Sequence, residues 1–166
     1  ITGDSQNGFS NYEDNHFWAY VKGCLQMAAA PISSERIEMT PVDILAMAIC
    51  EITFRGDKGL HVANLRNPVD ISWNDFFNLI QPFFNKSIQI VDPAEWQNNL
   101  VNIEESNALW RLKELYIESA DSSDNTPATE RIWSQAALQS LDLKIDVSPK
   151  NLLDIYIPYL VEKDFF

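Results

Sequence analysis

The residues whose types and spacing most suggest chemistry are Tyr159 and Lys163, which stand four positions apart near the end of the chain. On a helix this spacing places both side chains on one face, where the ammonium group can lower the pKa of the phenol and make it a proton donor. Such chemistry also needs a nearby Ser or Thr and a loop that holds a cofactor, and neither accompanies this pair. We therefore interpret Tyr159, together with Tyr156, as a packing residue of a terminal helix.

The other candidates for catalysis or metal binding are few. His16 and His61 are the two histidines of the sequence, and neither has a Cys, Asp or Glu at ligand spacing. Cys24 and Cys50 lie in apolar helical patterns and are expected to be buried, reduced thiols. The sequence has no nucleophile elbow, no Walker loop and no dinucleotide-binding glycine pattern. It therefore predicts no catalytic residue and no metal site within the chain.

The balance of charge limits the partners of the chain. Among 166 residues, 24 Asp and Glu stand against 12 Lys and Arg, which gives a net charge of −12. A surface this acidic disfavours nucleic acid and anionic membranes, because both are bound by basic side chains. No apolar run approaches the roughly 20 residues of a membrane span. The apolar content of 46% indicates a globular domain, and two cysteines without a disulfide framework favour a cytoplasmic protein.

Helix-start signals and apolar spacing predict the elements that would position functional residues. Residues 14–30 have the spacing of a helix, which Pro31 should end. At Thr40 to Asp43 we expect Thr40 to cap a second helix, with Pro41 in its first turn and Asp43 in a capping box. Further helices are expected over these ranges: 72–83, 92–100, 107–119, 132–141 and 148–160.

Two short strands complete the predicted fold, one at 60–65 and one at 87–91. The fold class is therefore α/β and mostly helical, with two or more short strands. Residues 119–130 are polar and turn-rich, which is typical of an exposed loop. Because two strands alone make a marginal sheet, we expect part of the architecture to lie outside this chain.

The order of several segments resembles a known family. The segments are ITGDSQNGFSN, YVKGCLQMAAAP, EMTPVDILAMAICEI, LHVANLRNPVDISWNDFFNLI, IQIVDPAEWQNNL, NALWRLKELYIE and SPKNLLDIYIPYLVEKDFF. Together they resemble the C-terminal, substrate-binding part of thioester reductase domains. Those domains terminate nonribosomal peptide synthetases, some polyketide synthases and carboxylic acid reductases, and they belong to the extended short-chain dehydrogenases. Aminoadipate reductase resembles the same stretch, so the substrate class stays open.

The resemblance implies that residues 1–166 form a single substrate-binding lobe of a Rossmann-type reductase, a fragment without its cofactor-binding domain. In the family, a loop leaving the cofactor site directly precedes a segment like Thr2 to Ser5, and the catalytic residues lie upstream. The implied reaction is reductive release. A carrier-bound acyl or peptidyl thioester on a phosphopantetheine arm takes a hydride from NADPH and leaves as an aldehyde, or as an alcohol after a second hydride. NADPH would be bound by the upstream domain, and this chain alone is expected to be inactive.

Substrate contacts are expected from two segments, one continuing the loop that leaves the cofactor site and one beginning the helix near residue 40. They are Thr2, Gly3 and Ser5, and Met39, Thr40, Pro41 and Val42. Backbone amides at a helix start can hold a polar or anionic group. A simpler interpretation stays open, in which Thr40 only caps the helix and Ser5 only forms a turn.

The implied carrier protein raises an electrostatic difficulty. Carrier proteins are commonly acidic, and like charges disfavour a broad contact with an acidic lobe. Docking would then need a local basic patch. Lys22, Arg111 and Lys113 are the candidates, although each can equally be ordinary surface charge.

Two other functions remain open at this point. The chain can be a non-catalytic interaction module that recognises a carrier protein. It can also come from an extended short-chain dehydrogenase that acts on free nucleotide sugars or fatty acyl-CoA, although the MTPVD and SWNDFFNLI segments agree less well with that class.

Overall fold

The computed structural model of the chain describes residues 1–59, 61–118 and 132–166. Its helices are α1 (His16–Met27), α2 (Val42–Arg55), α3 (Trp73–Ile80), α4 (Pro93–Val101), α5 (Lys113–Glu118), α6 (Ile132–Ser140) and α7 (Pro149–Glu162). Two single-turn 3-10 helices, η1 (Gln81–Phe83) and η2 (Trp110–Leu112), extend the pattern. The strands are β1 (Ala29–Pro31), β2 (Arg36–Glu38), β3 (Asp70–Ser72) and β4 (Gln89–Val91). The predicted α/β class, mostly helical with short strands, is confirmed, and the loop predicted at 119–130 lies outside the described residues.

The described strands form two separate pairs. β1 runs parallel to β4, with Ala30 opposite Ile90, and β2 runs antiparallel to β3, with Ile37 opposite Ile71. The strand predicted at 87–91 is therefore confirmed as β4. The strand predicted at 60–65 is wrong over its described residues, 61–65, because no described strand pairs with them.

α1 is shorter than its apolar spacing predicts. Its start is fixed by the Asn15 side chain, which accepts hydrogen bonds from the backbone N–H groups of the next turn. Its end comes at Met27 because Ala28 takes a left-handed conformation, with φ of 53°. The prediction that the helix continues to residue 30 is wrong, since Ala29 and Ala30 pair with β4 instead.

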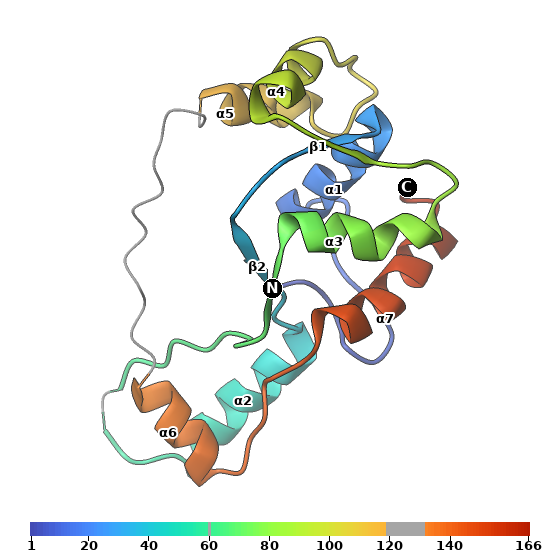
Figure 1. Cartoon of the computed structure of the whole chain (residues 1–166). Coiled ribbons are helices and arrows are strands. Elements are labelled where there is room, and N and C mark those ends of the chain that lie inside the picture. Colours follow the sequence, from blue (N-terminus) through green and yellow to red (C-terminus); the bar gives the residue numbers. More distant parts are fainter. Residues whose placement is uncertain (60, 119–131) are drawn as a thin grey trace.

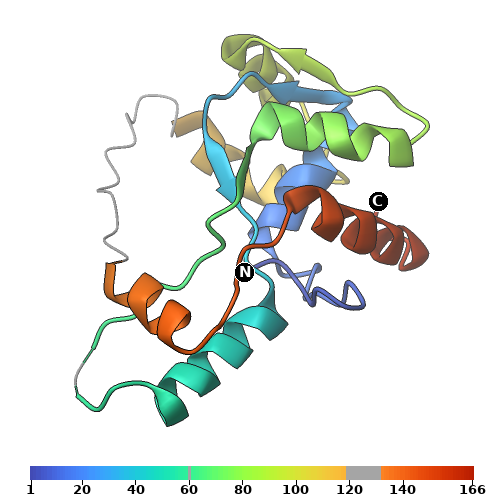
Figure 2. The ribbon, with the colours of Figure 1, turned by 60° about the horizontal axis from the view of Figure 1, so that its bottom comes forward.

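The main core lies where α1, α3 and α7 meet. Its largest fully buried side chains include Trp18, Phe76, Leu152 and Tyr156. α3 and α7 lie side by side in Figure 1, with α4 and α5 at one end of this body. Figure 2 shows the same body with α2 and α6 set apart below it.

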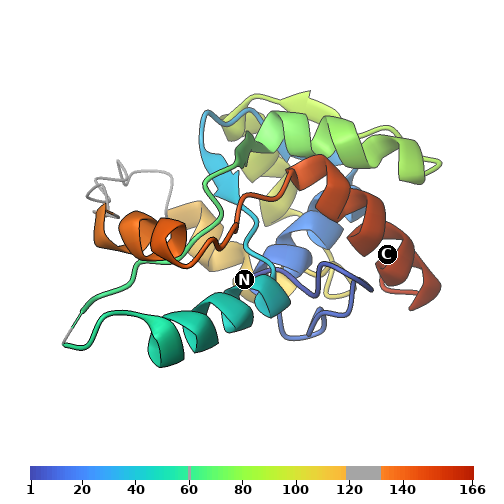
Figure 3. The same ribbon diagram turned by 90° about the horizontal axis from the view of Figure 1, so that it is seen from below.

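α2 and α6 form a second, smaller unit, side by side in Figure 3. Its buried centre is Ala48 with Leu138 and Ile145. The apolar side chains Val42, Leu45, Ala46, Ile49 and Ile52 follow helical spacing, but they do not form one buried face, since Val42 and Ile49 are 42% and 51% exposed. The contact with α6 is made around Ala48, where Ile44 and Ile52 pack too, so the rest of this apolar side of α2 meets solvent. Cys50 is also exposed, contrary to prediction, whereas Cys24 is buried as expected.

A fully buried amide, Asn67, joins the smaller unit to the main body. Its side-chain nitrogen donates to the carbonyl oxygens of Met39 and Val147, both at 2.8 Å. Its side-chain oxygen accepts from the backbone N–H groups of Val69 and Val147 at 3.1 and 3.2 Å. Its own backbone N–H donates to Thr40 Oγ1 at 3.0 Å. We call this arrangement the Asn67 clamp.

The clamp changes how α2 begins. Pro41, not Thr40, is the residue that precedes the helix, and no side chain caps it. The predicted Thr40 cap is wrong because Thr40 Oγ1 accepts from Asn67 instead. The predicted capping box is wrong as well, since the Asp43 carboxylate accepts from the Ser5 N–H at 2.9 Å and from the Ser5 hydroxyl at 2.6 Å. Both polar groups thus hold distant segments against the helix start.

Two features are absent from the described residues. These residues include no helix that is both long and apolar enough to cross a membrane. They also include no group of three or more His, Cys, Asp or Glu side chains placed to hold a metal ion.

Candidate functional site

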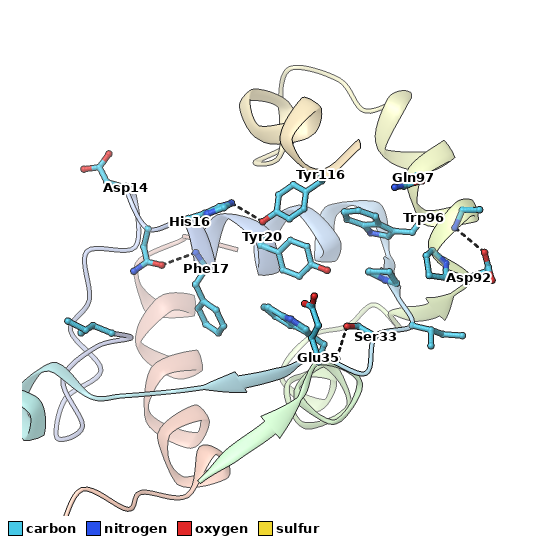
Figure 4. A pocket seen from close by; sticks show the side chains of 17 residues that line it. Asp14, His16, Phe17, Tyr20, Ser33, Glu35, Asp92, Trp96, Gln97 and Tyr116 are labelled. Carbon is cyan, nitrogen blue, oxygen red and sulfur yellow. Dashed lines mark hydrogen bonds between the residues drawn. The ribbon is translucent and has the colours of Figure 1, made fainter. Parts of the chain in front are cut away.

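A cavity of about 1100 Å³ lies between α1, the start of α3, α4 and α5. We call it the aromatic pocket, because five aromatic rings line it: Phe17, Tyr20, Trp73, Trp96 and Tyr116. Figure 4 shows these side chains together with three carboxylates, Asp14, Glu35 and Asp92. Ile1 also lines it.

Local sequence chemistry places each ring. The Asn15 cap starts α1, and residues 16 and 20 then share one face because they are four positions apart. Ser72 caps α3 by accepting from the Asp75 N–H at 3.1 Å, which puts Trp73 at the first position of that helix. Asp92 and the following proline start α4, one turn before Trp96.

The rings contact one another around the cavity. Trp73 stacks on Phe17 with ring centroids 5.6 Å apart and meets Tyr20 edge-on at 4.7 Å. Tyr116 lies 5.2 Å from Tyr20 and 5.9 Å from Trp96. Such packed rings form a largely apolar wall with defined ring faces.

His16 and Tyr116 close one side of the aromatic pocket. His16 Nε2 lies 2.8 Å from the Tyr116 hydroxyl, which ties α1 to α5 across 100 residues of sequence (Figure 4). Burial raises the pKa of Tyr116, so its phenol stays neutral near pH 7. The pair fixes the pocket wall and offers a polar edge to whatever enters.

The thiol of Cys24 lies behind Tyr20 and is not a nucleophile. Burial raises the pKa of Cys24 to about 12, and the neighbouring side chains of Tyr20 and Trp96 offset only part of this effect. Burial also raises the pKa of Tyr20. Because only the thiolate attacks, a neutral buried thiol is inert.

The structure brings most of the predicted substrate-binding residues together, but in a buried junction outside the aromatic pocket. The Thr2 N–H donates to Thr40 O at 3.1 Å, and the Val42 N–H donates to Gly3 O at 2.9 Å. The Tyr156 hydroxyl donates to Gly3 O at 3.0 Å. Met39 and Pro41 are buried there too, whereas Ser5 and Val42 reach the surface. Substrate binding by these residues stays a prediction, and the residue preceding them, Ile1, is the one that lines the pocket.

Two of the three predicted docking cations meet in a second groove of about 470 Å³, which we call the basic groove. It is lined by Lys22, Arg111 and Lys163, together with Glu13, Glu105 and Asp164. Lys22 lies over the Phe165 ring, with its nitrogen 4.5 Å from the ring centroid. Lys113, the third predicted cation, instead lies over the Trp110 ring at 3.9 Å.

Sequence reasoning missed the residues that make the aromatic pocket. From the sequence, His16 is considered only as a metal ligand, and Trp73 and Trp96 fall in predicted helices without a functional role. The spacing of an apolar stripe shows that side chains share a face, but not whether that face ends at a cavity. Glu35 carries no signal in the sequence, because its position follows from the turn between β1 and β2.

Comparisons with known proteins lead to reductases. The chain is 24% identical over 177 residues to the L-2-aminoadipate reductase of Schizosaccharomyces pombe, which covers 99% of this chain and 12% of that protein. It is 25% identical over 179 residues to the L-2-aminoadipate reductase of Saccharomyces cerevisiae, covering 99% of this chain and 13% of that protein. It is also 26% identical over 120 residues to the non-reducing polyketide synthase SAT8 of Stachybotrys chartarum. That match covers 70% of this chain and 5% of that protein. The chain thus spans a small part of the relatives that it matches, and no family model matches it.

Solved structures share the fold over almost the whole chain. The terminal R domain from the myxalamid PKS-NRPS biosynthetic pathway matches with a TM-score of 0.80 and 23% identity, covering 99% of this chain and 42% of that one. A thiolation-reductase di-domain from an archaeal non-ribosomal peptide synthetase matches with a TM-score of 0.77 and 21% identity. That match covers 99% of this chain and 34% of the other chain. The resemblance predicted from the sequence is confirmed, and the fold is that of part of a terminal reductase domain.

Proposed function

We propose that this chain is the substrate-binding part of an NADPH-dependent thioester reductase. The aromatic pocket would hold the acyl or peptidyl group of a thioester carried on the phosphopantetheine arm of a carrier protein. NADPH, bound outside these residues, would supply the hydride that releases the acyl group as an aldehyde, with a second hydride giving the alcohol. The residues of this chain would bind and orient the acyl group and keep water from it.

The observation that carries this proposal is the position of Ile1 in the lining of the aromatic pocket. Through the resemblance, the segment beginning at Thr2 continues a loop that leaves the cofactor site. If that resemblance holds for this chain, a cavity beside Ile1 would lie on the side from which a hydride would come.

The chemistry of the aromatic pocket suits an acyl group. Its volume of about 1100 Å³ is slightly above the roughly 300–1,000 Å³ usual for small-molecule sites, and its walls are largely aromatic. Trp96 and Tyr20 are buried behind the cavity surface, at 4% and 7% exposure, so the walls are held by the core.

The same pocket does not suit NADPH. Its lining includes Asp14, Glu35 and Asp92 and no Lys or Arg, so it would repel a pyrophosphate. The five glycines of the sequence form no phosphate-binding loop. We expect no binding of NADPH to the isolated chain by isothermal titration calorimetry. Micromolar binding would contradict this division of roles.

Saturation-transfer NMR on the isolated chain tests the acyl pocket directly. The probe is hexanoyl-pantetheine with its thioester sulfur replaced by NH, so that it cannot hydrolyse. We expect saturation transfer to the hexanoyl protons, and we expect Ala94→Trp, which adds bulk at an exposed lining position, to abolish it. Ala46→Trp places the same bulk on an exposed position of α2 and should leave the signal unchanged. An absent signal, or equal loss in both variants, would refute the pocket assignment.

The basic groove is the place where a carrier would dock, and it raises a second candidate function. Lys22, Arg111 and Lys163 are a local patch of cations that an acidic carrier could meet, and Glu13, Glu105 and Asp164 in the same groove balance their charge. The same patch would serve a non-catalytic module that only recognises a carrier. The parent gene separates the two functions, since a reading frame that continues upstream into a glycine-rich nucleotide loop supports the reductase, and a start codon just before Ile1 supports the module.

A further inference from the structure

The aromatic pocket has a strongly acidic lining among the described residues. Its lining includes three carboxylates, Asp14, Glu35 and Asp92, and neither Lys nor Arg. The acidic composition of the chain does not by itself produce this imbalance. In the basic groove of the same chain, three cations face three carboxylates.

The aromatic walls reinforce the negative character of this pocket. The face of an aromatic ring carries negative electrostatic potential and attracts a cation within about 6 Å of the centroid. Trp73 has the ring type that binds cations most strongly, and Phe17 and Tyr116 are the other partly exposed aromatic rings of the lining. Tyr20 and Trp96 lie largely buried behind them, so rings from α1, α3 and α5 form the part of the wall that an ammonium group could meet.

Glu35 adds an exposed negative charge to the lining of this pocket. In Figure 4 its carboxylate points toward Tyr20, and its charge is one of the causes that raise the pKa of Tyr20, after burial. The backbone N–H of Glu35 donates to Ser33 Oγ at 3.1 Å, which orders the turn that presents it. Tyr20 stays neutral, so Glu35 is free to pair with a charge that enters from outside.

We propose that the aromatic pocket selects a ligand bearing a protonated amine, held between the aromatic faces and the Glu35 carboxylate. The substrate named by this inference is an acyl or peptidyl thioester with a free amine, and that part of the inference rests on the proposed function. The preference for a cation is a property of the chain alone and can be measured without any thioester.

The test compares three probes of one shape: benzylammonium chloride, benzyl alcohol and sodium benzoate. Their dissociation constants are measured on the full chain by NMR titration of the tryptophan indole N–H signals. We expect benzylammonium to bind about fivefold or more tightly than benzyl alcohol, and benzoate to bind most weakly. The advantage of benzylammonium should shrink at 0.5 M NaCl, because salt screens exposed charge.

Two variants that each remove one negative charge distinguish binding at a specific site from general attraction of cations to an acidic protein. Glu35→Gln should reduce the preference for benzylammonium over benzyl alcohol to about twofold or less. Glu105→Gln removes one negative charge in the basic groove and should leave the preference for benzylammonium unchanged. Equal binding of the cation and the alcohol, or equal loss in both variants, would overturn the inference.

The outcomes also separate this inference from the proposed function. Binding of the neutral hexanoyl probe without any preference for the ammonium probe would retain the acyl pocket and overturn the cation site. A cation preference without binding of the hexanoyl probe would retain the cation site and overturn the thioester assignment.

Discussion

Removal of the Asn67 side chain should destabilise the protein more than any surface change, because that one amide holds three separate chain segments. In Asn67→Ala, the carbonyl oxygens of Met39 and Val147 lose their donor, and the N–H groups of Val69 and Val147 lose their acceptor. Asn67 is fully buried, so water cannot readily replace these bonds.

The expected size of the effect follows from the bonds. Four hydrogen bonds at a net of roughly 1 kcal/mol each give a loss of about 4 kcal/mol in the free energy of unfolding. That is a large part of the roughly 5–15 kcal/mol that stabilises a typical domain. With a urea m-value of about 2 kcal/mol/M, the midpoint of unfolding should fall by about 2 M.

Urea unfolding followed by tryptophan fluorescence and far-ultraviolet circular dichroism measures this midpoint. Asn78→Ala, an exposed site on α3, is the matched control and should change stability by less than about 0.5 kcal/mol. Asn67→Asp keeps the shape but turns a carboxylate toward two carbonyl oxygens. Its deficit relative to the wild type should narrow as the pH falls, because the protonated carboxyl can donate again. If Asn67→Ala unfolds at the same urea concentration as Asn78→Ala, the clamp has no such role.

Two further predictions concern titratable side chains. Burial alone would raise the pKa of Asp43, but the hydrogen bonds from Ser5 outweigh it and the pKa is lowered. The stability that Asp43 contributes is therefore present above its unfolded pKa of about 3.9 and is lost as the pH falls through the folded value. Asp43→Asn should show a shallower loss of stability below about pH 4 in acid unfolding, and an unchanged slope would contradict this. With Ellman's reagent, native protein should react at the exposed Cys50 and not at the buried Cys24. Native Cys50→Ser should then be unreactive, and rapid reaction of that variant would show that Cys24 is accessible.

Local sequence chemistry predicted the helices whose starting bonds are local. Ser72 accepts from a residue three positions on, and Asp92 accepts from one two positions on, as their sequence patterns indicate. Thr40 and Asp43 have the same residue types in the same pattern, yet they bond to Asn67 and Ser5, which lie 27 and 38 positions away. A cap motif therefore shows which polar groups are available, and tertiary structure decides which partners they take.

The strands and the pocket depend on contacts that no local window contains. β2 and β3 have three residues each, too few for an alternating pattern, and Ile37 finds Ile71 only when the chain folds. The 61–65 segment has a strand-like composition, but no described strand pairs with it. The aromatic pocket likewise needs His16 and Tyr116 to meet across 100 positions. The sequence indicated which residues are apolar, whereas the cavity between them is a property of the packed helices.

The turn at Asn7 and Gly8 determines where this protein should deamidate. Gly8 has φ of +78°, and a β-carbon there would lie 2.8 Å from Tyr159 Cβ, so no other residue fits. Asparagine followed by glycine readily cyclises to a succinimide, because the next backbone nitrogen attacks the side-chain amide, and Asn7 is exposed. Asn67 is followed by Pro68, whose nitrogen carries no hydrogen and cannot close that ring in the same way. Deamidation should therefore accumulate at the amino-terminal turn, while the buried amide that joins the two units is spared.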